Sequence, residues 1–339
     1  MTPKSLWLYV SFSILLVFFS IATLLVGDTP LNIIWEGIQN RFFGDLSEWN
    51  PLLDERLPRL IVIICTGASL AVSGAVMQAL FHNPLASPSV LGITSGGSLA
   101  VVAILIFGWH HDFPFLLPIS ASIGCFATLL IVYALSYARG GGASMTTLIL
   151  SGIAISTVLM SVQSAIMYAF RDHWQLIQTL TEWEAGSTMD RSWQHVHMQL
   201  PLTLVGLSGC WLYRNEINIL ALGEEEAKNL GVEVETVRWR LFVCIALLTG
   251  GAIAAVGIIA YFGLVLPNLI RRLQGPDNRS LIPLCILIGS ALLVGLDILM
   301  RIFHVHSLSI GNISAIVGGG FFLVLLFETN ELKQRRMAW

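Results

Sequence analysis

Long apolar runs dominate the chain, and short polar segments separate them. A transmembrane helix needs about 20 largely apolar residues, and most of the runs have the length of one bilayer crossing. The pattern therefore predicts an all-α, polytopic membrane protein. The nine runs lie near 6–26, 60–81, 90–108, 113–138, 143–170, 198–213, 241–270, 281–296 and 307–327.

The run 241–270 is too long for one upright helix and too short for two full ones. Gly257, Gly263 and Pro267 are candidate breaks within it, because proline interrupts a helix and glycine weakens it. Lysine and arginine concentrate in short cytoplasmic loops, so the two possible counts can be compared. With the run split and the N-terminus inside, 12 of the 18 basic residues lie inside, whereas a single crossing leaves seven there. The sequence predicts ten spans and two cytoplasmic termini.

Composition supports a membrane protein and excludes other classes. The chain is 55% hydrophobic and only 12% charged, about half the charged share of a soluble domain. A net charge of −3 offers no basic face for nucleic acid. No polar region is long enough for a soluble domain, so we expect one transmembrane domain over residues 1–339. The interrupted eighth span is expected to face protein or a water-filled cavity, not lipid.

Motifs for catalysis or metal binding are not found in the sequence. The chain has no G-x-x-x-x-G-K-[ST] motif, so it does not bind ATP phosphates by the P-loop mechanism. Its five cysteines lie within apolar runs, as small core residues do, and two His-x-His pairs have poor spacing for a metal on a helix. We expect no metal, no cofactor bound by this chain and no active site of its own.

Charged residues are rare within the spans, which leaves an ion-coupled carrier little to work with. Asp297 and Arg301 are the exception. They are four residues apart at the end of the ninth span and share a helix face, where they form either a local ion pair or part of a functional site. The energy for transport is expected to come from a partner protein.

Two polar segments are candidates for contact with partners. The inner loop, about 214–240, contains a short predicted helix at 223–231, with acids at its start and glycine at its end. Leu220, Leu222 and Leu230 give this helix an apolar edge, which favours a docking helix about as much as a solvated loop. On the outside, Arg56 and Arg59 precede the second span; they either contact lipid headgroups and acidic neighbours or receive an acidic partner.

Several motifs together resemble the FecCD family of ABC importer permeases for iron-siderophores, haem and cobalamin. The similarity covers essentially the whole chain. Its segments are Arg56–Arg59, Gly74–Pro88, Leu91-Gly92, Leu220–Glu224, Ala227, Leu230-Gly231, Gly263–Pro267, Arg271, Gly275–Asp277, Asp297, Arg301, Gly311 and Gly319–Phe322. The sequence departs from the family pattern at Asn268, Ser309 and Gly320. These positions lie in the eighth and tenth spans, where they affect local helix breaks and the gate.

The resemblance implies a type II ABC importer permease fold with ten transmembrane helices, in which spans 2–5 and 7–10 are inverted repeats. It implies an identical or related second permease, two ABC ATPase subunits that bind ATP and Mg²⁺, and a periplasmic substrate-binding protein. The implied location is the inner, cytoplasmic membrane of a bacterium. A ferric siderophore is the expected cargo, with haem or cobalamin as alternatives. A carrier or channel that works alone is the alternative from a different class.

The resemblance also assigns residues. Arg56, Arg59 and Arg301 match positions that receive acidic residues of the binding protein. The ATPase coupling helix is expected to comprise Leu220, Ala221, Leu222, Gly223, Glu224, Ala227, Leu230 and Gly231. The translocation path or its gate is expected near Asn83, Pro84, Pro88, Gly92, Pro267 and Asn268.

Overall fold

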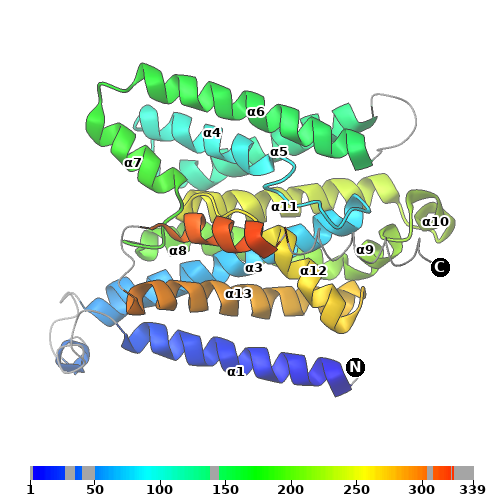
Figure 1. Ribbon diagram of the computed structural model, residues 1–339, viewed down its shortest axis with the longest axis horizontal. Helices are drawn as coiled ribbons and strands as arrows, with labels where there is room; N and C mark the ends of the chain where they lie inside the picture. Colours follow the sequence, from blue (N-terminus) through cyan, green and yellow to red (C-terminus); the bar gives the residue numbers. More distant parts are fainter. Residues whose placement is uncertain are drawn as a thin grey trace.

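The computed structural model describes residues 3–26, 35–39, 50–137, 145–303, 308–321 and 323, and they contain no β-strand. The helices lie roughly along one direction and form a bundle with two ends (Figure 1). We call them the η1 end and the α10 end, after a helix found at each. The elements are α1 (Pro3–Leu25), η1 (Pro51–Arg56), α3 (Leu57–Leu80), α4 (Ile93–Ile106), α5 (Leu116–Tyr137), α6 (Met145–Ala169), α7 (Trp174–Glu184), α8 (Trp193–Leu212), α9 (Arg214–Leu220), α10 (Glu224–Asn229), α11 (Val234–Val256), α12 (Phe262–Gln274), α13 (Asn278–Ile302) and a last helix, Ile310–Phe321.

The ten predicted spans correspond to ten of these helices. Six of them are long and apolar enough to cross a membrane individually, and Ile93–Ile106 and Ile310–Phe321 are shorter apolar helices. The other two are α8, which contains Pro201, and the 13-residue α12. The predicted all-α membrane architecture is confirmed.

The long run 241–270 is indeed divided. Helix α11 ends at Val256, Gly257 follows with φ of +83°, and α12 begins at Phe262 after Tyr261, whose φ is +62°. Two of the proposed breaking residues, Gly263 and Pro267, lie inside α12. Pro267 is the sixth residue of α12, so it removes one backbone hydrogen bond from the second turn of the helix.

Two short helices occupy equivalent places in the two predicted repeats. Helix α4, the second span of the first repeat, has 14 residues and follows Gly92 with φ of +73°. Helix α12, the second span of the second repeat, follows Tyr261 in the same left-handed conformation. In Figure 1 α4 lies toward the η1 end and α12 toward the α10 end. Short, interrupted helices at matching positions of inverted repeats are typical of a transport path.

Helix α3 forms the centre of the bundle, and 89% of its apolar window is buried. Glycines let its neighbours approach closely. A Cβ on Gly67 would lie 2.3 Å from the Gly289 carbonyl oxygen of α13, and one on Gly74 would lie 1.8 Å from that of Gly263 on α12. Helices α1 and α6 lie at the edges, with 6% and 11% of their windows buried, so their apolar faces are available to lipid or to another chain.

Candidate functional site

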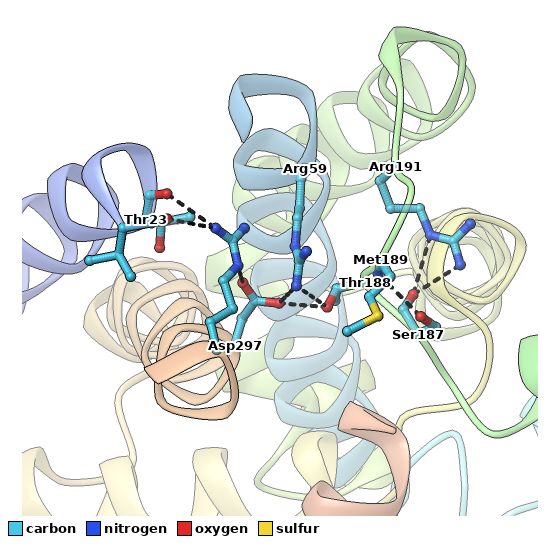
Figure 2. A network of polar contacts seen from close by, with 9 residues as sticks. Thr23, Arg59, Ser187, Thr188, Met189, Arg191 and Asp297 are labelled. Atoms are coloured by element: carbon cyan, nitrogen blue, oxygen red, sulfur yellow. Dashed lines mark hydrogen bonds and ion pairs between the residues drawn. The ribbon is translucent and has the colours of Figure 1, made fainter. Parts of the chain in front are cut away.

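A buried carboxylate organises the η1 end. Asp297 of α13 is 1% exposed, and its Oδ1 lies 2.6 Å from a guanidinium nitrogen of Arg59 on α3. The hydroxyl of Thr188 donates to the same oxygen at 2.5 Å, and Oδ2 lies 3.3 Å from Nε of Arg301. Figure 2 shows Arg59 pointing toward this carboxylate. The predicted Asp297–Arg301 pair is therefore present, and Arg59 joins it from another helix.

The arginines at this end also hold the end of α1. Arg56 donates to the carbonyl oxygens of Leu24 and Leu25 at 2.9 and 3.3 Å, and Arg301 donates to those of Thr23 and Val26. The last carbonyls of a helix have no partner within it and carry partial negative charge. Arg56, at 4% exposure, thus acts in this structure as a cap for α1 rather than as a free surface cation.

A cavity of about 480 Å³ opens beside this network. Arg59, Arg301, Thr188, Ser309 and Asn312 contribute polar groups to its wall, and acidic Glu182 and Asp190 also lie along it. Two of the three arginines predicted to dock a partner therefore line a cavity at the same end of the bundle. Arg56 is not among the cavity's lining residues.

Arg191 belongs to the same region, although the sequence analysis did not single it out. Its guanidinium donates to the Ser187 carbonyl oxygen through Nε and a terminal nitrogen, at 3.2 and 3.0 Å, and lies 3.2 Å from the His195 ring. Burial lowers the pKa of Arg191 to about 10; Asp190 opposes this shift and Arg59 adds to it. These contacts join the two ends of the loop that carries Thr188 and fix this loop to the start of α8.

The predicted coupling helix exists at the opposite end. Gly223, with φ of +131°, precedes α10, and Gly231, with φ of +84°, follows it as expected for a helix end. Leu222 and Leu230 are 66% and 61% exposed, whereas Leu220 is 2% exposed. The expectation that Leu220 belongs to an exposed apolar edge is wrong, because this side chain packs into the core with Ala227.

A buried arginine fixes α10 to the bundle. Arg238 of α11 is 3% exposed and pairs with Glu224 at the start of α10 and with Glu235, the latter at 2.8 Å. It also donates to the Tyr133 hydroxyl at 2.5 Å. Glu224 therefore holds the helix in place, while the exposed residues Leu222, Glu225, Glu226 and Leu230 form the outward surface of this segment.

The predicted path residues come from one loop and one helix that meet. Asn83, Pro84, Pro88 and Gly92 lie between α3 and α4, and the side-chain nitrogen of Asn268 on α12 donates to the Pro84 carbonyl oxygen at 2.8 Å. Asn268, one of the departures from the family pattern, thus connects α12 with the loop before α4. Ser309, another departure, accepts from the Asn312 backbone at the start of the last helix, and a Cβ on Gly320 would meet nothing within 4 Å.

Metal chemistry finds no support among the described residues. No group of three or more His, Cys, Asp and Glu side chains is placed to hold a metal ion in that part of the chain. The five cysteines are buried and unpaired. The two ends suit contacts with proteins, since one carries paired charges and the other carries exposed leucines.

Comparison with known proteins identifies the family. The model of the FecCD transport family matches residues 14–328. The chain belongs to this family. It is 34% identical to the hemin transport system permease protein HmuU of Yersinia pestis, with 94% of each chain covered. It is also 37% identical to the vitamin B12 import system permease protein BtuC of Vibrio vulnificus, over 85% of this chain and 87% of the relative.

A solved structure supports the same conclusion for the fold. It is described as a metal-chelate type ABC transporter in an inward-facing conformation, with a TM-score of 0.79 and 27% identity. The match covers 95% of this chain and 99% of that chain. The FecCD protein is therefore a multi-pass membrane protein with the fold of an ABC transporter permease.

Proposed function

We propose that this FecCD protein is the permease subunit of an ABC importer that moves a ferric siderophore across the cytoplasmic membrane of a bacterium. A substrate-binding protein delivers the chelate at the η1 end, and two ATPase subunits act at the α10 end. The observation that carries the proposal is the separation of the two candidate partner surfaces to opposite ends of one helical bundle. The η1 end then faces the periplasm, and both termini lie in the cytoplasm.

The exposed surface of the coupling segment supports an ATPase partner. Leu222 and Leu230 lie on either side of α10, with Glu225 and Glu226 between them in sequence. Two exposed leucines rimmed by charge match the pattern of an interface with an apolar centre and a polar rim. ATP and Mg²⁺ are bound by the partner, so hydrolysis is a reaction of the complex and not of this chain.

The arginines at the η1 end support docking of acidic residues of the binding protein. Arg59 and Arg301 share one carboxylate, Asp297, and both line the open cavity. A guanidinium has five N–H donors, so each retains donors for a second carboxylate. Arg56 contributes through its hold on α1, and its docking role requires that the partner reach a largely buried group.

A second permease, identical or related, completes the transport path. The exposed apolar face of α6 and the exposed Ile316 and Val317 of the last helix are surfaces for it or for lipid. The path then follows the short helices α4 and α12, and alternating access opens it to one side at a time. Helix α12 meets the loop before α4 at the predicted path residues, which are Asn83, Pro84, Pro88, Gly92, Pro267 and Asn268.

The identity of the transported chelate is the most specific part of the proposal. A metal-chelate type transporter shares the fold, which supports an iron chelate, while relatives named for hemin and for vitamin B12 are at similar identity. Haem and cobalamin are therefore the alternative cargoes. Few charged side chains lie in the spans, which disfavours a carrier coupled to an ion gradient.

Uptake of radiolabelled ferric chelates tests the proposal. Cells with the permease are compared with cells that lack it, and with cells whose ATPase subunit has a Walker-motif lysine replaced. We expect uptake of at least one ferric siderophore that needs both proteins, with haem and cobalamin as parallel cargoes. Uptake that persists without the ATPase would identify a carrier that works alone and would overturn the proposal.

A further inference from the structure

The segment that carries the coupling helix is joined to α13 by a compact set of polar contacts. The side-chain oxygen of Asn218 on α9 accepts from the backbone and the side-chain nitrogens of Asn278, at 2.7 and 2.8 Å. The Asn218 side-chain nitrogen donates to Asp277 Oδ1 at 2.7 Å. The Asn218 side-chain amide thus makes three hydrogen bonds with two consecutive residues, Asp277 and Asn278, and only one of its N–H groups is left over.

That turn is also the end of α12. Only Gly275, Pro276 and Asp277 separate Gln274, the last residue of α12, from Asn278. Asp277 caps α13 by accepting from the Arg279 backbone at 3.0 Å. The connection has only three residues, and Pro276 within it has a fixed φ, so the end of α12 stays close to the start of α13. A displacement of Asn218 therefore moves the end of α12 with the start of α13.

On its other side, α9 is continuous with the coupling segment. Residues 221–223 lead directly from Leu220 into α10, and the Leu220 carbonyl oxygen lies 2.5 Å from the His82 ring. The buried Ile217 and Leu220 hold α9 against the core. A load applied to the exposed Leu222 thus reaches α9 through Ala221 and reaches the α12–α13 turn through Asn218.

Helix α12 is the interrupted helix that the path requires. It begins after the break at 257–261, and Asn268 within it donates to the Pro84 carbonyl oxygen in the loop before α4. A movement of α12 is therefore felt in the loop that leads to α4. Contacts of this kind transmit coupling when they join elements with alternative arrangements.

We propose that Asn218 is a positioning residue that transmits the movement of the coupling helix to α12, through its amide contacts with Asp277 and Asn278. This inference rests on the proposed function, because it assumes that an ATPase acts on α10. It assigns a role to a residue that lies outside the exposed docking surface.

The test uses the complete transporter in liposomes and measures chelate taken up per ATP hydrolysed. Asn218→Asp places a carboxylate against Asp277, at the position of a 2.7 Å hydrogen bond. We expect the ratio to fall about 5-fold or more, as for loss of a coupling energy above 1 kcal/mol. ATPase subunits are expected to co-purify in normal amounts. The double variant Asn218→Asp with Asp277→Asn restores a donor–acceptor pair and is expected to recover the ratio.

A matched comparison lies one turn away on the same helix. The Asn215 side-chain oxygen accepts from Nε of Arg279 at 2.8 Å, so Asn215→Asp makes the same chemical change but meets a cation. We expect it to keep the contact and the ratio. An unchanged ratio for Asn218→Asp, or a loss of ATPase subunits from that variant that the double variant does not reverse, would overturn the inference. Failure of the proposed function itself would be seen separately, as uptake by the unaltered permease without ATPase.

Discussion

Arg59 on α3 and Asp297 on α13 form an ion pair of 2.6 Å across 238 positions of sequence. Asp297 is buried, at 1% exposure, and Arg59 keeps 11% of its side chain exposed, toward the cavity. Thr188 (Figure 2) also contacts the carboxylate, and Arg301 completes its surroundings. One acidic group thus sets the positions of two arginines that are candidates for docking a partner.

Asp297→Asn is expected to destabilise the permease markedly. The change leaves two largely buried guanidinium groups without their carboxylate, and breaking a buried ion pair costs about 3–5 kcal/mol. Asp172→Asn is the control, because Asp172 is 93% exposed and lies 3.9 Å from Arg171, a pair expected to contribute less than about 1 kcal/mol. Thermal unfolding of both variants in detergent measures the difference. Equal Tm values for the two would show that the network does not stabilise the fold.

Arg59→Gln is expected to weaken docking of the substrate-binding protein. The cavity would lose one of its two cations, and truncating one partner of a close charge pair typically costs about 2 kcal/mol or more. Arg171→Gln is the control, because it removes the same charge from an exposed site between α6 and α7. The affinity of the binding protein for permease in nanodiscs measures both. A similar loss in the two variants would indicate general charge attraction rather than a defined site.

Leu222→Asp is expected to release the ATPase subunits. It places a charge at the centre of the exposed apolar surface, where a main contact residue contributes about 2 kcal/mol, or roughly 30-fold in affinity. Lys228→Gln, on the same short helix, changes a charge at the rim and should have a small effect. Co-purification from detergent gives the result. Glu224→Arg is a poor variant for this purpose, since it would place two guanidinium groups together at Arg238.

Gly74→Ala is expected to destabilise the contact between α3 and α12. Its Cβ would lie 1.8 Å from the Gly263 carbonyl oxygen, and overpacking of this kind costs about 1–3 kcal/mol. Gly319→Ala is the matched control, because a Cβ there meets nothing within 4 Å and alanine favours a helix. The Tm should fall only for the first variant. A loss of stability in both would indicate a general sensitivity of glycines rather than close packing.

Glu184 at the end of α7 is expected to make stability depend on pH. Burial raises the pKa of this carboxyl above its usual 4.5, and a hydrogen bond with Gln163 partly opposes the shift. A raised pKa means that the folded protein binds the proton more tightly than the unfolded chain does. The stability that the protonated Glu184 adds is therefore complete below about pH 4.5. It is lost as the pH rises through the pKa of this carboxyl in the folded protein. Glu184→Gln should flatten this part of the profile of Tm against pH, and an identical profile would contradict it.

Much of the architecture is determined by the sequence alone. Apolar length and the placement of basic residues predict ten spans and a divided seventh run, because both report the bilayer as solvent. Local signals also predict the α10 helix. Acidic residues at its start and glycine after its end favour a helix through interactions with neighbours only a few residues away. Asp297 and Arg301 are a predictable pair for the same reason, being one helical turn apart.

Contacts between distant segments were decided only by the tertiary structure. No local signal shows that Arg59 reaches Asp297, that Arg56 caps α1 or that Leu220 is buried while Leu222 is exposed. Asn218 is likewise an ordinary polar residue of a short helix until α13 is placed beside it. Helix formation and membrane insertion depend on a residue and its near neighbours, whereas pairing and burial depend on which helices meet, and packing of whole helices determines that.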